Sequence, residues 1–368
     1  MKIGILSMQR VINYGSFLQA FALKETLTQL GADCSFIDIK PGPRIFNNNV
    51  RKKKNKIIIY LERIDKYFFK RIKHQIFIRK RKEMFFNEFF PILGLSKKPN
   101  YNSNYDVVVI GSDEVFNCAR DVEWGFAKTL LGEGLNSKKV ITYAASCGHT
   151  TLEQLEKFGL KSVVSNAMKN IDTVSVRDEN TKNFVKALTN KEACENVDPV
   201  FIYDFKEKVP DKIPYRNYIL VYAYDNRIND MPTINEIRAF SRKKNKKIIS
   251  AGVYQNWADL NILCSPFELL AYFRDADYVV TDTFHGTVFS IKYNKQFATI
   301  VRDSNRQKLG YLLKKFRLSD REIKDINEME LILSTKPNYE YANKLIKIEK
   351  EKAIKYLCES IGLKSSLT

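Results

Sequence analysis

The sequence predicts an α/β protein built from two Rossmann-like domains that face a central cleft. Apolar, β-branched segments alternate with amphipathic ones along most of the chain. Some strands, such as DVVVIG at 106–111, are continuous apolar runs of the kind found inside parallel sheets. A charged stretch at 206–214 separates two such series, and 368 residues suffice for two domains. We expect domains at 1–205 and 213–335, and a helix within 336–368 that packs back across both.

The first half begins with a strand at 2–7. Ser16 is positioned to cap a helix that ends at Gly31. A helical insertion is expected at about 50–90. The other expected elements of this half are strands at 34–39, 106–111, 140–145 and 173–176, and helices at 151–170 and 178–188.

The second half contains one strong start signal for a helix. Ser265 and Glu268 form a capping box, and Pro266 occupies the first helical position. This helix should run to about Arg274. The other expected elements are strands at 218–223, 247–250, 278–281 and 297–301, and helices at 232–244, from Gly286, and at 338–362.

Composition excludes several classes of protein. The 44% hydrophobic and 28% charged fractions are those of an ordinary globular domain. No run of eighteen apolar residues is present, and the apolar run at the N-terminus is too short for a secretory signal. Six cysteines lack paired or zinc-binding spacing, which indicates reduced thiols, no metal and a cytoplasmic protein.

Positive charge is concentrated in the insertion. Of a net charge of +19, roughly fourteen basic residues lie between Arg51 and Lys82, against the acidic Glu62 and Asp65. Apolar residues interleave at spacings of three and four, which predicts one or two basic amphipathic helices. Three interpretations stay open. The helices pack on the domain with lysines in water, they contact an anionic membrane at its inner face, or they bind nucleic acid. No recognition motif accompanies the charge, so no nucleic-acid partner is expected.

The most informative segment is VVTDTFHGTVF at 279–289. A buried strand ends at Thr281, a polar turn carries Asp282 and His285, and Gly286 opens a helix. The free amides and the dipole of a helix N-terminus attract phosphate or carboxylate. The chain has three histidines, so one at such a junction is a candidate functional residue. The alternative is that His285 caps the helix and Gly286 turns the chain.

Three further turns follow predicted strands in the same way. Because ligands bind outside the carboxyl ends of parallel strands, these turns should converge. Arg177 also follows a strand, where a guanidinium binds phosphate or carboxylate, or pairs with Asp178, Glu179 or another neighbour. The three turns are Asn13-Tyr14-Gly15-Ser16, Gly111-Ser112-Asp113-Glu114 and Ser146-Cys147-Gly148-His149.

Six sequence blocks, in order, resemble the polysaccharide pyruvyl transferase family over roughly residues 1–300. The resemblance implies a two-domain fold similar to the GT-B glycosyltransferases. It also implies transfer from phosphoenolpyruvate onto a sugar, usually as a cyclic pyruvate ketal. The insertion and the last sixty residues match no block. The blocks are NYGSFLQAFAL (13–23), YDVVVIGSDEVFN (105–117), YAAS (143–146), SVRDE (175–179), VDPV (197–200) and TDTFHGTVFSI (281–291).

This chemistry suggests roles for the candidate residues. Ketal formation needs an acid/base group that titrates near neutral pH, and His285 is our candidate. Asp282 either orients His285 or is a carboxylate at the helix N-terminus, and Asp113 is an alternative base. The donor's phosphate and carboxylate require cations and amides. Donor candidates are Arg177, Arg302 and the Gly286 and Thr287 amides; candidates for binding acceptor or donor are Asn13, Tyr14, Gly15, Ser16, Ser112, Asp113 and Ser146.

The expected function is therefore pyruvyl transfer in cell-surface or exopolysaccharide biosynthesis. The partners would be phosphoenolpyruvate and an oligosaccharide or polysaccharide precursor, whether lipid-linked or not. The reaction demands no nucleotide, metal or other cofactor. Two alternatives stay open: a GT-B-type glycosyltransferase that uses a nucleotide-sugar, and a non-catalytic glycan-binding protein.

Overall fold

The computed structural model describes residues 1–45, 64–119, 121–302 and 305–362, with side chains omitted at 64–69. Part of the expected basic insertion, 50–63, therefore lies outside the described residues. So does the end of the expected C-terminal segment, 363–368.

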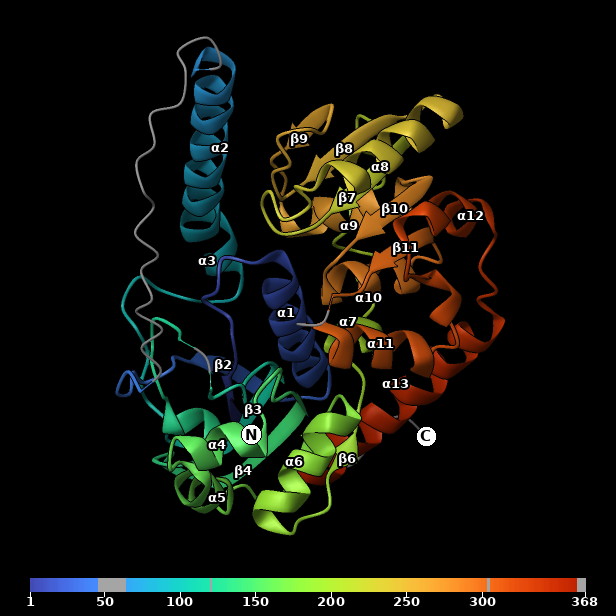
Figure 1. Cartoon of the computed structure of the whole chain (residues 1–368). Helices are drawn as coiled ribbons and strands as arrows, with labels where there is room; N and C mark the ends of the chain where they lie inside the picture. The colour runs from blue at the N-terminus through green and yellow to red at the C-terminus, as the bar shows by residue number, and fades with distance from the viewer. Residues whose placement is uncertain (46–63, 120, 303–304, 363–368) are drawn as a thin grey trace.

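Two six-stranded parallel sheets form two lobes, which confirms the predicted fold class (Figure 1). The first sheet has the order β2-β1-β3-β4-β5-β6, and the second has the order β12-β11-β10-β7-β8-β9. The first contains β1 (Lys2–Leu6), β2 (Asp33–Ile37), β3 (Tyr105–Asp113), β4 (Ser137–Ala145), β5 (Ser175–Val176) and β6 (Cys194–Glu195). The second contains β7 (Tyr218–Tyr222), β8 (Lys247–Ala251), β9 (Leu260–Ile262), β10 (Tyr278–Thr281), β11 (Gln296–Ile300) and β12 (Glu322–Ile323).

Helices cover both sheets. The first lobe carries α1 (Tyr14–Gln29), η3 (Lys128–Leu131), α4 (Leu152–Lys157), α5 (Lys161–Met168), α6 (Glu179–Thr189) and α7 (Pro199–Ile202). Its insertion forms α2 (Ile64–Met84), η2 (Phe85–Phe89) and α3 (Phe90–Ile92). The second lobe carries α8 (Met231–Lys244), α9 (Pro266–Asp275), α10 (Phe284–Lys292), α11 (Arg306–Lys315), η5 (Ser319–Arg321), η6 (Ile326–Glu328) and α12 (Met329–Ser334), and α13 (Glu340–Ile361) follows.

Local sequence explains where several helices begin and end. Asn13, not the expected Ser16, caps α1, because its side chain accepts a hydrogen bond from the Ser16 amide at 3.1 Å. The helix expected at 151–170 is divided into α4 and α5 at Gly159, whose φ of 66° interrupts the helix. At Ser265 the expected capping box is present and starts α9.

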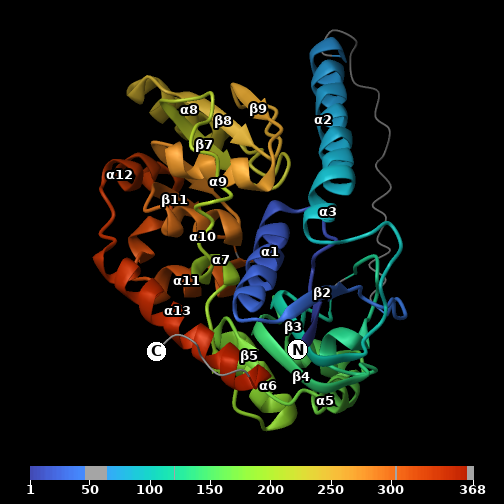
Figure 2. The ribbon, with the colours of Figure 1, turned by 180° about the vertical axis from the view of Figure 1, so that it is seen from behind.

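Apolar packing and hydrogen bonds join the two lobes. The centroid of the Phe21 ring of α1 lies 5.0 Å from that of the Phe267 ring of α9. Tyr14 of α1 donates a 2.8 Å hydrogen bond to the Cys264 carbonyl of the second lobe. From α13, Tyr356 donates to the Thr142 carbonyl of β4 at 2.8 Å. Helix α13 runs from the second lobe along the first, as Figures 1 and 2 both show.

Helix α2 belongs to the first lobe in sequence but contacts the second. Arg81 forms a two-point ion pair with Asp225, at 3.0 and 2.6 Å, and donates to the Gly252 carbonyl at 3.2 Å. His74 and Phe77 pack on the Tyr254 ring, with ring centroids 4.9 and 5.4 Å apart. The helix stands beside the edge of the second sheet in both views (Figures 1 and 2).

None of the helices described here combines the length and the apolar character needed to cross a bilayer.

The docking of α2 can be tested at Arg81. We expect Arg81→Ala to increase amide hydrogen exchange in α2 and in the segment around Asp225, because the half-buried two-point pair is lost. Arg79→Ala is the matched control on the same helix. Its partner Glu83 is exposed, and the pair should contribute little. Equal exchange in both variants would contradict the interdomain role of Arg81.

Candidate functional site

A pocket with about 640 Å³ of empty volume lies where carboxyl ends of strands from both lobes meet. The first lobe supplies residues at or after the ends of β1, β3 and β5, and the second supplies residues at or after the ends of β7, β8, β10 and β11. The lining is Asn13, Ser16, Asp113, Glu114, Arg177, Tyr222, Tyr224, Arg227, Val253, Asp282, Thr283, Phe284, His285, Asn305 and Lys308.

His285 lies in the first turn of α10. Thr283 caps this helix, because its hydroxyl accepts a hydrogen bond from the Gly286 amide at 3.0 Å. The Thr283 carbonyl accepts one from the Thr287 amide at 3.1 Å. The expectation that the Gly286 and Thr287 amides are free for a ligand was therefore wrong. The helix starts two residues earlier than expected, and His285 is not its capping residue.

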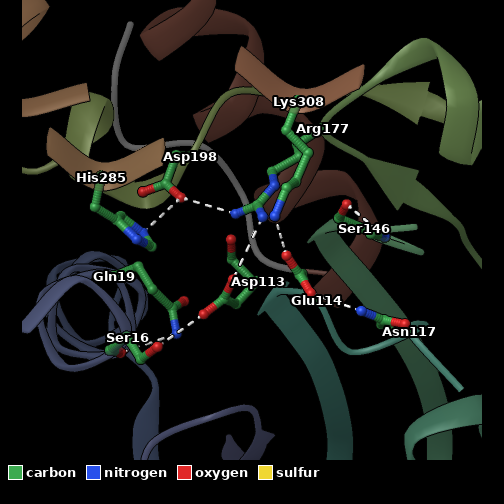
Figure 3. Close-up of polar contacts among 12 residues, drawn as sticks. Ser16, Gln19, Asp113, Glu114, Asn117, Ser146, Arg177, Asp198, His285 and Lys308 are labelled. Atoms are coloured by element: carbon green, nitrogen blue, oxygen red, sulfur yellow. Dashed lines mark hydrogen bonds and ion pairs between the residues drawn. The ribbon is translucent and has the colours of Figure 1, made fainter. Parts of the chain in front are cut away.

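The imidazole of His285 is held between the two lobes. Its ring packs directly on the backbone of α1 at Gly15, where a Cβ atom would overlap the ring. On the other side, Nε2 lies 3.4 Å from Oδ2 of Asp198, without hydrogen-bond geometry. The residue is 8% exposed and reaches the pocket wall (Figure 3). Gly15 therefore does not bind a ligand itself, but it makes room for the ring.

Arg177 links two carboxylates at the base of the pocket. Its guanidinium lies 3.3 Å from Asp113 and 3.3 Å from Asp198, and it stacks 4.1 Å from the centre of the Phe284 ring (Figure 3). Among the described residues, Arg177 forms no ion pair with Asp178 or Glu179, the neighbours that the sequence offered as alternative partners. Burial opposes ionisation of both carboxyls. Arg177 and His285 outweigh this and lower the pKa of Asp113 and of Asp198.

The lowered pKa values make both carboxylates stabilising in the ionised form. Their contribution to the free energy of unfolding is complete above the unfolded-state pKa of about 4. It is lost as the pH falls through the lower folded-state pKa. Ser16 supports Asp113 by donating a hydrogen bond from its hydroxyl at 2.9 Å. Both carboxylates are thus fixed as hydrogen-bond acceptors at neutral pH.

A second cation enters from α11. Lys308 forms an ion pair across the cleft with Glu114, which also accepts a 2.7 Å hydrogen bond from Asn117 (Figure 3). The side chains of Lys308 and Glu114 are 19% and 17% exposed, so little water screens the pair.

Asp282 does not orient His285. Its Oδ2 lies 3.0 Å from Arg227 and 3.3 Å from Arg302 instead. Burial raises the pKa of Asp282, although both arginines act to lower it. The carboxylate next to His285 is that of Asp198, because the Asp282 side chain points toward the two arginines of its own lobe. Arg302 lies beside Asp282, outside the residues that line the pocket.

Three other expected residues have structural roles. Tyr14 is buried, with its hydroxyl on the Cys264 carbonyl. Ser112 is buried and donates to the Ala144 carbonyl at 3.3 Å. Ser146 is buried and donates to Asp178 at 2.8 Å. None of them lines the pocket, so the structure does not support the expectation that they contact acceptor or donor.

Sequence reasoning missed Asp198, Lys308, Tyr224 and Arg227. Asp198 did carry a signal, since the VDPV segment was part of the resemblance. Lys308 carried none, because its role depends on how the lobes face one another.

The pocket contains buried polar atoms that the protein leaves without hydrogen-bond partners. Among the described residues, such atoms include Nε of Arg177, Nε2 of His285 and Oδ1 of Asp282, all from residues that line this pocket. Buried polar atoms are nearly always bonded, so these three atoms of the pocket lining are left to bond to a ligand or to water. Within the described part of the chain, no group of three His, Cys, Asp or Glu side chains could hold a metal ion.

Cations, carboxylates and one imidazole are placed side by side in the pocket. The described lining residues include three carboxylates (Asp113, Glu114, Asp282) and three permanent cations (Arg177, Arg227, Lys308). Asp198, a further carboxylate, lies against both Arg177 and His285. Groups that can bind an anion and a group that can transfer a proton therefore lie at one place.

Comparisons with known proteins agree with this architecture. A family model described as polysaccharide pyruvyl transferase matches residues 13–304, which confirms the resemblance seen in the sequence. No curated protein matches the sequence of the chain.

Solved structures are similar in fold. Arabidopsis thaliana UGT89C1 complexed with UDP is 10% identical with a TM-score of 0.50, over 98% of this chain and 100% of that one. UDP-GlcNAc 2-epimerase from Neisseria meningitidis is 10% identical with a TM-score of 0.49, over 98% and 99%. A Thermobaculum terrenum O-GlcNAc transferase mutant is 11% identical with a TM-score of 0.42, and the chain, aligned over 98% of its own length, spans 64% of that protein.

The packing of His285 on α1 can be tested with two glycine substitutions. Gly15→Ala should lower the Tm by about 2–6 °C, because the new methyl group overlaps the imidazole. Gly310→Ala is the matched control in α11, where the nearest atom to the new Cβ is 4.0 Å away. It should leave the Tm unchanged or raise it, since alanine favours helix. A Tm for Gly15→Ala at or above that of the wild type would contradict the close approach.

Proposed function

The chain belongs to the polysaccharide pyruvyl transferase family, and on that premise we propose that it transfers a pyruvyl group from phosphoenolpyruvate to two hydroxyls of a sugar. The product would be a cyclic ketal on a precursor of a cell-surface or exopolysaccharide. The observation that carries the proposal is the imidazole of His285, which faces the pocket, lies 3.4 Å from Asp198 and has two cations, Arg177 and Lys308, along the same pocket wall.

We assign the first proton transfer to His285. The imidazolium protonates the methylene carbon of phosphoenolpyruvate, and a sugar hydroxyl forms a bond to the neighbouring carbon. The carbon–oxygen bond to phosphate then breaks, and a second hydroxyl takes its place. The two sugar hydroxyls release two protons. One of them reprotonates His285, which gave its proton to the methyl group, and the other leaves with phosphate. Asp198 would stabilise the charged imidazole between these steps.

The donor requires neutralisation of its phosphate and carboxylate. Arg177 and Lys308 are our candidates, and the unpartnered Nε of Arg177 supports this role. Both cations already pair with carboxylates of the first lobe, so the donor would share them with Asp113 and Glu114. Asp113, held as a carboxylate, is suited to accept a hydrogen bond from the attacking hydroxyl and so to orient it. No cofactor or metal enters this scheme.

The experiment replaces His285. We expect His285→Ala and His285→Gln to reduce phosphate release from phosphoenolpyruvate by at least about 100-fold, because no other group supplies the proton. Phosphorus NMR with fractionated cell-envelope glycan precursors would follow the enol phosphate signal. Tyr341→Ala, which removes an exposed ring of α13 outside the pocket, is the control and should keep full turnover.

Three outcomes would redirect the assignment. Wild-type turnover in both His285 variants would remove the histidine from the mechanism. Thermal stabilisation by a nucleoside diphosphate, but not by phosphoenolpyruvate, would favour a glycosyltransferase instead. Binding of glycans without consumption of either donor would indicate a binding protein.

We further propose that the outer face of α2 contacts an anionic membrane, where a lipid-linked acceptor would be found. The inner face of this helix docks on the second lobe through Phe77 and Arg81. Its exposed residues combine charge with apolar side chains, a pattern suited to a charged bilayer surface. They include Lys70, Arg71, Lys73, Ile76, Ile78, Arg79, Lys80 and Lys82, and the exposed Phe86 follows in η2.

Vesicle binding tests this contact. The protein should co-sediment with vesicles containing phosphatidylserine and not with pure phosphatidylcholine. Changing Lys73, Lys80 and Lys82 to Gln should weaken binding by roughly 100-fold, since each charge contributes about 1 kcal/mol. The same change at Lys344, Lys347 and Lys350 of α13 gives an identical net charge and should have less effect. Equal loss in both triple variants would mean that net charge alone, not α2, drives binding.

A further inference from the structure

One side of the pocket carries an exposed aromatic ring that the donor chemistry does not use. Tyr224 follows β7, lines the pocket and is 50% exposed. Beside it, Tyr222 is buried and packs against Phe273 and Phe289, with ring centroids 5.4 and 6.3 Å apart. Val253 completes this apolar patch on the second lobe. The patch contrasts with the ionic groups elsewhere in the pocket.

The ring of Tyr224 is oriented by its charged neighbours. Arg227 lies 5.3 Å from the ring centre and 3.0 Å from Asp282, so it connects the aromatic patch to the end of β10. Desolvation, together with Asp113 and Glu114 of the other lobe, raises the pKa of Tyr224 to about 12. The phenol is therefore neutral at physiological pH, and it lines the same pocket as the two carboxylates.

Helix α2 fixes the segment that carries this ring. Asp225, the next residue, accepts both hydrogen bonds of the Arg81 pair and also a 2.7 Å bond from the Tyr254 amide. Asn226 exchanges further bonds with Tyr254 and Asn256. A platform held in this way loses little freedom when a ligand binds. The insertion from the first lobe thus positions a pocket residue of the second.

We propose that Tyr224 is the stacking platform for the acceptor sugar, whose hydroxyls then face Asp113 and Glu114 on the opposite wall. A pyranose has one face of C–H groups, which suits an aromatic ring, and an edge of hydroxyls, which suits carboxylate acceptors. This subsite rests on the proposed function in one respect: it presents the hydroxyl pair to the same pocket as His285. Arg81 acts through Asp225 as a positioning residue.

Saturation-transfer NMR with methyl pyranosides tests the platform without any donor. The probes are the methyl α- and β-pyranosides of glucose, galactose and mannose and their 2-acetamido forms. We expect transfer from the protein to C–H protons on one face of at least one probe. Tyr224→Ala should reduce this signal roughly fivefold or more, while Tyr224→Phe keeps it, because the ring and not the hydroxyl provides the contact.

A matched control separates stacking from general loss of an aromatic side chain. Tyr341 is also exposed and has an arginine, Arg317, 3.9 Å from its ring centre, but it does not line the pocket. Tyr341→Ala should leave the signal unchanged. Retained transfer in Tyr224→Ala, or no transfer from the wild-type protein to any probe, would overturn the platform.

Failure of the platform is distinguishable from failure of pyruvyl transfer. If Tyr224→Ala consumes phosphoenolpyruvate with an unchanged KM for the acceptor, the reaction stands and the platform falls. If the wild-type protein binds a pyranoside through Tyr224 but never consumes phosphoenolpyruvate, the platform stands and the proposed reaction falls.

Discussion

The site depends on one close approach between the lobes, that of the His285 imidazole to the α1 backbone at Gly15. Any side chain at this position would displace the ring. The approach brings the end of β10 in the second lobe against Asp198 of the first, and Asp198 in turn contacts Arg177. Asp113, Arg177 and Asp198 form a cluster of buried charges within the first lobe, and the second lobe completes it by placing the imidazole against Asp198. The charged members stabilise one another because little water screens them.

The same arrangement divides the proposed labour between the lobes. The first lobe contributes carboxylates that can accept hydrogen bonds from hydroxyls, and the second contributes the imidazole, a lysine and the aromatic patch. Lys308 and Arg81 cross the cleft in opposite directions, one to Glu114 and the other to Asp225. We infer that acceptor and donor are aligned by contacts between the lobes, which rigid sheets on each side hold in register.

The fold was predictable from the sequence because apolar periodicity and caps are local. Runs such as 106–111 and the capping box at Ser265 specified strands and helices close to where they lie. The site was predictable only in part. His285 and Asp113 followed from their positions at strand ends, whereas adjacency in the chain suggested the wrong partner, Asp282, for the histidine. Contacts between residues far apart in sequence depend on lobe packing, which no local pattern encodes.

A crystal structure of the wild-type protein soaked with phosphoenolpyruvate would test the central claim most directly. The account predicts the donor in the interlobe pocket, with its phosphate or carboxylate within hydrogen-bond distance of Arg177 or Lys308 and its methylene carbon facing the His285 ring. Donor density outside this pocket, or a bound donor whose methylene carbon points away from the imidazole, would contradict it.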